Sequence, residues 1–385
     1  MSHSAVTLVD TIIAQALEKN ASDIHIEPDA RGLRVRFRID GLLYHHTYIP
    51  ENLADSLITR LKILAHINIA QKRIPQDGKF TIQVAGHPPL DVRVSTFPSI
   101  EGEKVVLRLL QRNNQFHTFD QLGMSPQLFE KFNDLIQRAS GFILVTGPTG
   151  SGKTSTLYAA LATLNNTEQH IVTLEDPVEY QIEGLVQGNI HPEAGFTFEK
   201  GVRAILRQDP DIVMVGEIRD AQTAQVAIEA ALAGHMMFST LHTAHAPGAL
   251  TRLVDMGIEP FLLNAAVSGI MAQRLVRKIC EHCKESYAPD THEHRMLEKL
   301  HLSCDMLYRG VGCKECHGLG HKGRTGIFEL LEMSNAMREL LMQRAIRDTL
   351  YDQACKDGMR PMVSDGMHKV SMGLVSLQEV IKAVS

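Results

Sequence analysis

Alternating apolar and polar residues mark the first third of the chain. In "LRVRFRIDG" (33–41), every second residue is apolar, and Arg34, Arg36 and Arg38 fall between them. Side chains alternate across a strand, so the arginines share one face, which we expect to be solvated, while the apolar residues share the other. The stretch "SDIHIEP" (22–28) alternates in the same way. Both stretches therefore predict strands of a sheet that is buried on one face.

Two helices and a further pair of strands complete this first region. Amphipathic periodicity predicts helices near residues 5–19 and 51–66, and "PLDVRVSTFPSIEGEKVVLRLL" (89–110) predicts two strands joined by a loop. Residues 1–112 are therefore predicted to form a small α+β domain on a half-buried antiparallel sheet. The polar, aperiodic stretch that follows is predicted to be a linker over 113–118.

Each of these two strands carries one arginine among apolar residues, Arg93 in the first and Arg108 in the second. Ion pairs with neighbouring carboxylates, Asp91 or Glu103, would account for both arginines. A phosphate group supplied by another part of the protein would instead give them a chemical role. The stretch by itself favours the ion pairs.

From Phe119 onward, continuous apolar runs separated by helical stretches replace the alternation. Such runs are typical of parallel strands that are buried on both faces. Residues 119–385 are therefore predicted to form an α/β domain, which includes a cysteine-rich segment over 277–326 and a helical tail over 335–385. The apolar runs are 142–145, 171–174, 212–215 and 236–238.

A phosphate-binding motif lies directly after the first of these runs. "FILVTGPTGSGKTSTLYAAL" (142–161) combines a strand, a Gly-x-x-x-x-Gly-Lys-Thr loop and a helix, which is the context that a P-loop requires. Glycines allow backbone N–H groups to surround a phosphate at the helix N-terminus, Lys153 reaches the β- and γ-phosphates, and Thr154 ligates Mg²⁺. The residues predicted to bind the nucleotide are Gly147, Pro148, Thr149, Gly150, Ser151, Gly152, Lys153, Thr154 and Ser155.

Polar residues follow three of the other predicted strands, where ligands of open parallel sheets bind. Glu175 ends one run, Glu217 follows another after a glycine, and His242 follows a third. Mg²⁺ and an attacking water both need oriented acceptors, so we expect Glu175, Glu217 and His242 to serve hydrolysis, with Glu217 also at Mg²⁺. Each residue alone would equally suit a solvated loop or a helix cap. Asp211 lies at the opposite end of its strand and is not expected to take part.

Two cysteine pairs predict a metal site. Cys280-x-x-Cys283 and Cys313-x-x-Cys316 can each hold a metal across a tight turn, and four thiolates favour structural Zn²⁺. A redox dithiol is the alternative, although it explains two pairs poorly. Cys304 and Cys355 fit neither pair and are predicted to be core thiols. His282 and His317 adjoin the pairs and are predicted to be solvated rather than ligands.

Composition narrows the function classes. The 385-residue chain has a formal net charge of −5, no tryptophan and no basic run, which argues against nucleic acid as a partner. Its longest apolar stretch is shorter than the ~20 residues of a membrane span, and its start lacks the features of a signal peptide. We therefore expect a soluble, cytoplasmic protein.

Taken together, these motifs resemble the ATPases of type II secretion and type IV pilus assembly over nearly the whole chain. "ASDIHIEP" and "FRIDG" match the N-terminal sheet domain, "GPTGSGKT" the P-loop, "TLEDPVEY" an acidic box, "LRQDPDIVMVGEIRD" the Walker B segment and "STLHTAHAPGALTRL" a histidine box. The tetracysteine segment points to the assembly and secretion branch. Within the histidine box, Ala244 and His245 depart from the expected Asn-Asp, which leaves a role for His242 but not for His245.

The resemblance implies a RecA-like P-loop domain, a homo-hexameric ring, and inner-membrane secretion or pilus platform proteins as partners. It implies that Arg93 and Arg108 reach the nucleotide of a neighbouring subunit, and that Arg203 and Arg207 contribute from the P-loop domain. An additional N-terminal domain that docks on membrane components has no counterpart in the sequence, so either a truncated chain or a short family member is expected. A nucleic-acid-translocating ATPase and a non-hydrolysing nucleotide switch are the alternatives.

Overall fold

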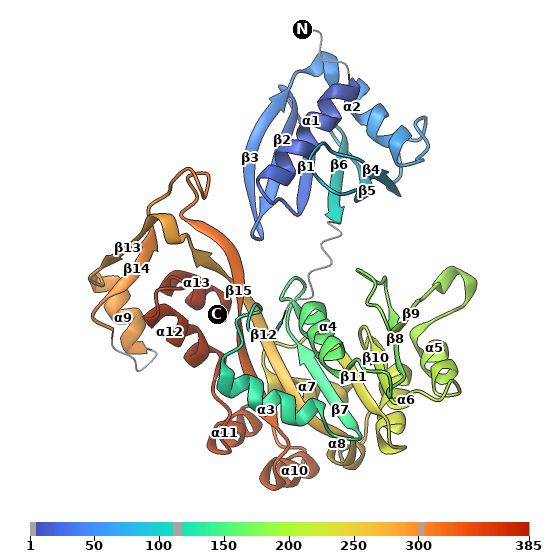
Figure 1. The fold of residues 1–385 in the computed structure, drawn as a ribbon, viewed down its shortest axis with the longest axis vertical. Helices are drawn as coiled ribbons and strands as arrows, with labels where there is room; N and C mark the ends of the chain where they lie inside the picture. The colour runs from blue at the N-terminus through green and yellow to red at the C-terminus, as the bar shows by residue number, and fades with distance from the viewer. Residues whose placement is uncertain (1–4, 111–117, 300–303, 385) are drawn as a thin grey trace. The chain divides into compact units, whose positions relative to one another are not determined.

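The protein consists of two compact units, Met1–Asn114 and Gln115–Ser385. The computed structural model describes residues 5–110, 118–299 and 304–384 (Figure 1). All of the linker expected over 113–118 except Thr118 lies outside the described residues.

The first unit is built on a six-stranded sheet in which every neighbouring pair is antiparallel, in the order β3-β2-β1-β6-β5-β4. The alternation in the sequence explains its one-sided burial, since Val35 and Phe37 are almost fully buried and the arginines between them are not. Helices α1 and α2 pack against each other, and α2 also contacts β2 and β4. The elements are α1 Ala5–Glu18, β1 Asp23–Asp29, β2 Gly32–Ile39, β3 Leu42–Ile49, α2 Glu51–Leu64, β4 Gln76–Ile82, β5 Leu90–Ser99 and β6 Gly102–Leu110.

A buried ion pair fastens α2 to the sheet. Lys62 Nζ lies 2.7 Å from Glu103 Oε1 and donates a second hydrogen bond of 2.6 Å to the carbonyl of Gln71. Both charged side chains are at most 5% exposed. Removing one partner of such a pair would leave an uncompensated buried charge. Glu103 is thus committed to Lys62 and is not available to Arg93 or Arg108.

The outer face of the sheet is a charge network rather than the solvated row of arginines expected from the sequence. Arg34 and Arg36 donate to the two oxygens of Glu27 at 3.0 and 2.7 Å, and Lys104 lies 3.0 Å from the same carboxylate. Burial would raise the pKa of Glu27, but Arg36 and Lys104 lower it to about 2. The sequence could not indicate this pairing because Glu27 comes from the neighbouring strand, opposite Arg34.

The second unit contains a seven-stranded sheet in the order β15-β12-β7-β11-β10-β8-β9, parallel throughout except for the β12–β15 pair. This arrangement confirms the predicted α/β fold with a buried parallel sheet. Its strands are β7 Gly141–Thr146, β8 Ile171–Glu175, β9 Val186–Asn189, β10 Ile212–Val215, β11 Met236–Leu241, β12 Val267–Ile279 and β15 His321–Glu332, and a separate two-stranded sheet comprises β13 Lys284–Tyr287 and β14 Leu307–Gly310.

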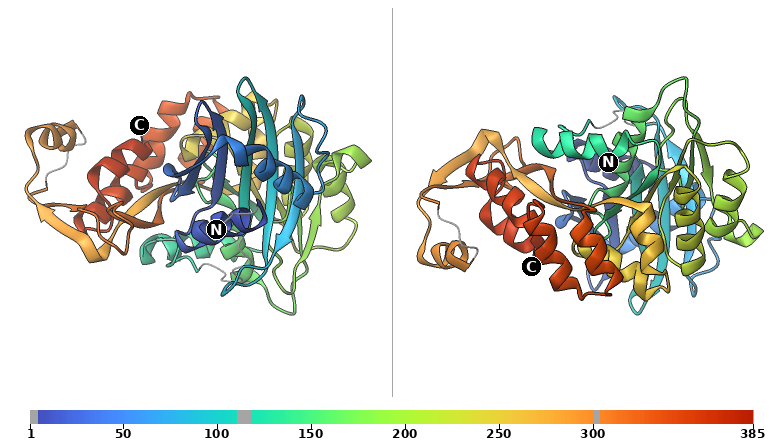
Figure 2. Two further views of the ribbon diagram at one scale, coloured as in Figure 1. Left: turned by 90° about the horizontal axis from the view of Figure 1, so that it is seen from above. Right: turned by 90° about the horizontal axis from the view of Figure 1, so that it is seen from below.

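The interior strand β7 contributes side chains to two hydrophobic cores. Phe142 and Leu144 join one core, whereas Ile143 and Val145 join the other, so successive side chains enter opposite faces of the sheet. Helices flank the sheet on both sides (Figure 2). They are α3 Pro126–Ile136, α4 Lys153–Leu164, α5 Phe198–Ile205, α6 Ala221–Leu232, α7 Ala246–Asp255 and α8 Pro260–Ala266.

The long antiparallel pair β12–β15 leads from this sheet to the cysteine segment and the helical tail. The tail packs back on the pair: Arg277 on β12 forms a 2.6 Å ion pair with Glu379, and Asp365 accepts a hydrogen bond from the backbone of Phe328 on β15. None of the described helices is both long and apolar enough to cross a membrane. The helices of this region are α9 Thr291–Lys299, α10 Asn335–Met342, α11 Arg347–Lys356, α12 Met362–Ser371 and α13 Leu377–Val384.

Candidate functional site

The P-loop connects β7 to α4 in the second unit. Gly147 and Gly152 have φ values of +153° and +87°, and a Cβ at either position would lie within 3.0 Å of an atom of Gln273. Glycine is therefore required at both positions for conformation and for space. The Lys153 side chain is buried, and its Nζ donates to the carbonyls of Gly147 and Pro148 at 2.9 and 3.1 Å.

Gln273 on β12 holds the P-loop in place, although sequence reasoning did not single it out. Its Nε2 donates to the carbonyl of Ser151 at 2.7 Å, and its Oε1 accepts from the Thr156 hydroxyl at 2.7 Å. The glutamine is 1% exposed. Gln273 directly follows the short apolar run of residues 269–272 on β12, which was the available signal, because a buried amide needs partners.

A second connection missed from the sequence joins the P-loop strand to the histidine box. Thr146, the last residue of β7, shares a 2.8 Å hydrogen bond between hydroxyls with Thr243 and accepts another from the Thr243 backbone N–H. The loop after β11 is thereby fixed against the start of the P-loop.

Glu217 and His242 meet at the ends of β10 and β11, which are neighbours in the sheet. His242 Nε2 lies 3.7 Å from Glu217 Oε2, and Arg219 donates to the other oxygen of Glu217. The hydrogen bond from Arg219 holds the pKa of Glu217 below its ordinary value. Arg219 also lies 3.5 Å from Asp176, so one guanidinium links the ends of β10 and β8.

Glu175, at the end of β8, is 3% exposed and is held by three side chains. The hydroxyls of Tyr158 and Thr173 donate to its two oxygens at 2.5 and 2.6 Å, and Gln187 donates at 3.3 Å. Burial raises the pKa of Glu175 in spite of these hydrogen bonds. Tyr158 comes from α4, so the helix that starts at the P-loop also orients this carboxylate.

His245 and Asp211 both form their contacts away from Glu175, Glu217 and His242. His245 Nδ1 is 3.4 Å from Glu329, a buried carboxylate that accepts from the backbone of Ala246 at 2.8 Å and of Met362 at 3.1 Å. His245 therefore turns toward the C-terminal helices. Asp211 accepts from the backbone of His170 at 2.6 Å at the opposite end of the sheet.

Arg203 and Arg207 lie on and just after α5, which packs on β8 and β10. Arg203 lies 3.4 Å from Glu199, and Arg207 donates to the carbonyl of Arg203 at 2.7 Å. Among the described residues, no hydrogen bond or ion pair joins either arginine to the P-loop. The structure thus does not bring them into the cluster formed by Lys153, Glu217 and His242.

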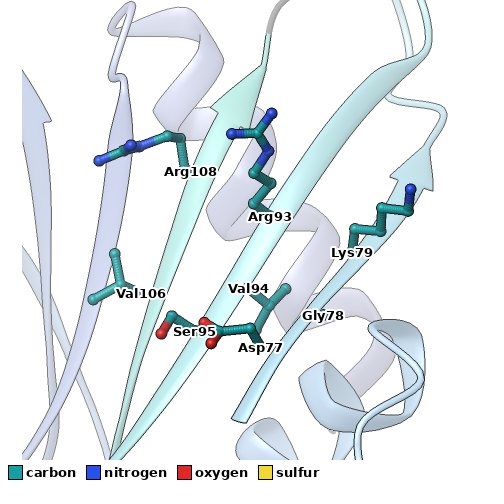
Figure 3. Close-up of a pocket in the computed structure, with 8 residues that line it drawn as sticks. All are labelled: Asp77, Gly78, Lys79, Arg93, Val94, Ser95, Val106 and Arg108. Atoms are coloured by element: carbon teal, nitrogen blue, oxygen red, sulfur yellow. The ribbon is translucent and has the colours of Figure 1, made fainter. Parts of the chain in front are cut away.

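In the first unit, Arg93 and Arg108 line a pocket of about 650 Å³ together with Lys79, Asp77 and Ser95 (Figure 3). Arg108 donates from Nε to Asp23 at 3.0 Å, rather than pairing with Asp91 or Glu103. No ion pair or hydrogen bond to the Arg93 side chain occurs within the described parts of the chain. The ion pairs expected with Asp91 or Glu103 are therefore wrong for Arg108, which pairs with Asp23 instead. For Arg93, no ion pair is found among the described residues.

The four cysteines of the two pairs converge. Their sulfur atoms all lie within 4.8 Å of one another, with separations of 3.8 Å for Cys280–Cys313 and Cys283–Cys316 and 3.7 Å for Cys313–Cys316. Four sulfurs at about 2.3 Å from a central Zn²⁺ would be separated by about 3.8 Å. Backbone N–H groups of Gly312 and Gly320 donate to two of the sulfurs. The cluster is thus compatible with a tetrahedral zinc site.

The fold and the P-loop define an ATPase of the P-loop class. The family model described as "Type II/IV secretion system protein" matches residues 2–382, and the chain belongs to this family. It is 46% identical to the type II secretion system ATPase E of Vibrio cholerae serotype O1 over 98% of this chain and 75% of that protein. It is 42% identical to the type IV pilus assembly ATPase PilB of Thermus thermophilus over 98% of this chain but 43% of that protein.

Comparison with solved structures also supports the ATPase fold. The pilus retraction motor PilT with bound ADP aligns with a TM-score of 0.63 at 27% identity, covering 97% of this chain and 96% of that one. The ATPase DotB of Legionella pneumophila aligns with a TM-score of 0.71 at 19% identity, over 98% and 95% of the two chains, and supports the fold alone.

Replacing Gln273 tests whether it supports the P-loop. In Gln273→Leu, the Thr156 hydroxyl and the Ser151 carbonyl lose their buried partner, which costs roughly 1–3 kcal/mol for each unsatisfied group. We expect a lower denaturation midpoint and ADP binding weakened by about tenfold in titration calorimetry. The exposed Gln222 on α6 supplies the control, Gln222→Leu. Wild-type stability and ADP affinity in Gln273→Leu would show that the loop holds its own conformation.

Proposed function

We propose that this chain is a Mg²⁺-dependent ATPase that works in the cytoplasm as a hexameric ring motor and acts on inner-membrane platform proteins. It would power protein secretion through a type II secretion system or assembly of a related type IV pilus. The observation that carries the proposal is the gathering of the P-loop, Glu217 and His242 at neighbouring strand ends. The names of relatives that share 42–46% of their residues with nearly the whole chain support the choice of system, type II secretion foremost.

The nucleotide would be bound by residues 147–155. The buried Ser151 hydroxyl has no hydrogen-bond partner among the described residues. Three neighbouring positions, Gly147, Gly150 and Gly152, are glycines, so no side chains cover the backbone there. Lys153 would exchange its two carbonyl acceptors for phosphate oxygens, which are stronger acceptors. Thr154 and Glu217 would hold Mg²⁺, whose preferred ligands are oxygens.

The acids would divide the remaining work. Glu175 is held rigidly by Tyr158, Thr173 and Gln187, which suits a group that orients or deprotonates the attacking water. Its Oε2 accepts only the Tyr158 hydroxyl among the described residues and so keeps a further lone pair for the water. His242 beside Glu217 would contact the phosphate being released. Arg93 and Arg108 would neutralise charge on the γ-phosphate bound by a neighbouring subunit, with Arg203 and Arg207 contributing from the P-loop unit.

The role of Glu175 predicts a specific kinetic loss. General-base catalysis contributes ~10²–10⁴ in rate, so Glu175→Gln should retain ATP binding while phosphate release falls by about that factor. Because burial raises the pKa of Glu175, the ionised base is lost at a higher pH than for an ordinary glutamate. Wild-type turnover should therefore decline on acidification, and this limb of the pH profile should vanish in the variant. Glu183→Gln, an exposed acid, is the control; wild-type turnover in Glu175→Gln would rule out the assignment.

The cysteine cluster predicts one structural Zn²⁺ per chain, bound by Cys280, Cys283, Cys313 and Cys316. Thiolate ligation couples metal binding to folding. The double change Cys313→Ser/Cys316→Ser should therefore abolish zinc in elemental analysis and lower the soluble yield. Cys304→Ser and Cys355→Ser, which alter cysteines outside the cluster, should keep a full equivalent of zinc. An undiminished zinc content in the double variant would contradict the site.

Action between subunits predicts complementation. Arginine fingers contribute roughly 10³–10⁵ in rate, so Arg93→Ala and Arg108→Ala should each cripple hydrolysis without loss of fold. Mixing Arg93→Ala chains with Lys153→Ala chains should restore part of the activity, because some interfaces would combine an intact P-loop with an intact arginine. Each variant alone at the same total concentration is the control. No recovery in rings shown to be mixed would place the arginines beside the P-loop of their own chain.

A further inference from the structure

A row of three cations crosses the sheet of the first unit. In the strand register, Lys79 on β4 is directly opposite Arg93 on β5, and Arg93 is directly opposite Arg108 on β6. Residues paired in this way project from the same face of a sheet. Figure 3 shows the three side chains on neighbouring strands, with Asp77 and Ser95 further along β4 and β5. Sequence reasoning found the two arginines but not the lysine, because pairing of β4 with β5 is not local.

The charges in this row are poorly balanced. Arg108 is directly opposite Asp23 on β1 and donates a hydrogen bond to its carboxylate. Lys79 and Arg93 have no hydrogen bond or ion pair to their side chains in the described ranges, and Arg93 has a cation on each side. Like charges directly opposite each other destabilise an antiparallel pair. The sheet gains no stability from this arrangement, and the exposed Lys79 and half-buried Arg93 are available to an anionic ligand.

The shape of the site indicates an anion with several charges. Neighbouring strands are about 4.8 Å apart, so the row spans roughly 10 Å of backbone. It borders the pocket of about 650 Å³ described above. The carboxylate of Asp77 lies in the next row, opposite Ser95, and forms no ion pair with Lys79 or Arg93. One end of the pocket is therefore cationic and the other carries a single negative charge.

We infer that Lys79 is a third phosphate-contacting residue, which together with Arg93 and Arg108 binds the terminal phosphates of ATP held by a second copy of the chain. Lys79 stands on an edge strand of the sheet, at the end of the row. It makes the row long enough to favour a triphosphate over a diphosphate. This inference rests on the proposed function, in which Arg93 and Arg108 face that nucleotide. The competing explanation is that Lys79 only protects an edge strand from aggregation.

Steady-state kinetics of the full chain test the role of Lys79. Lys79→Gln should raise the KM for ATP about tenfold or more, as expected for losing one hydrogen bond to a charged group, and should change the inhibition constant of ADP much less. Lys79→Arg should stay close to wild type. Lys72→Gln is the matched control, because Lys72 is an exposed lysine of the same unit outside the pocket. A merely structural lysine would affect ATP and ADP equally.

Two further measurements test whether the charge of the pocket governs ATP binding and whether Lys79 stabilises the fold. Asp77→Asn removes the negative charge of the pocket and should lower the KM for ATP. The thermal midpoint of Lys79→Gln should be unchanged or slightly higher, because a like-charge repulsion disappears. A variant that binds ATP less well while remaining as stable as wild type would exclude misfolding as the cause.

The outcomes separate this inference from the proposed function. A wild-type KM and ADP inhibition in Lys79→Gln, alongside a crippled Arg93→Ala, would overturn the role of Lys79 and leave the arginine assignment intact. Full activity in both variants would overturn the cation row and the arginine roles together. An increase in KM for ATP that the Lys72→Gln control does not share would support the row.

Discussion

The inner parallel strands of the second unit, β7, β8, β10 and β11, are buried on both faces, and this burial constrains where chemistry can occur. Every side chain of β7 enters one of two hydrophobic cores up to its last residue, so the strand offers no room for a polar group within its length. A buried polar group without a hydrogen-bond partner would destabilise the fold by more free energy than most single contacts contribute. Ionisable and hydrogen-bonding residues therefore collect where strands end, and the P-loop, Glu217 and His242 share that edge because their strands are neighbours.

Three buried polar residues hold this edge of the sheet in place. Thr146, Glu175 and Gln273 are polar and buried, and each is satisfied by partners from another element. A buried hydrogen-bonded group has few alternative positions, since any displacement leaves a donor or acceptor unpaired. Together they attach the P-loop to β12, to the histidine box and to the end of β8. The mobility that a glycine-rich loop would otherwise have is limited by residues outside the loop.

Local patterns allowed the sequence to predict the fold class, the P-loop and the convergence of four cysteines. The P-loop is contiguous, and the cysteine pairs carry their geometry in their spacing. The contacts that organise the sites are not local: Gln273 is 122 residues from Ser151, and Arg108 is 85 residues from Asp23. A polar residue in an apolar run indicates that some partner exists, but only the strand register identifies it. The same limitation explains why Arg34 and Arg36 were expected to be solvated when they surround Glu27.

The two units also differ in how their charges are balanced, and this difference supports the proposed action between copies of the chain. In the second unit, Glu175, Asp176 and Glu217 lie at the ends of β8 and β10, on the same edge of the sheet as the P-loop. The P-loop has a single lysine, Lys153, and burial lowers its pKa. Arg219 is already committed to Glu217 and Asp176. A triphosphate with about four negative charges would thus meet few uncommitted cations there. The first unit has the opposite imbalance at Lys79 and Arg93, whose charges lack a counterpart among the described residues. In the proposed ring, each interface would bring the two kinds of surface together, which electrostatic complementarity favours.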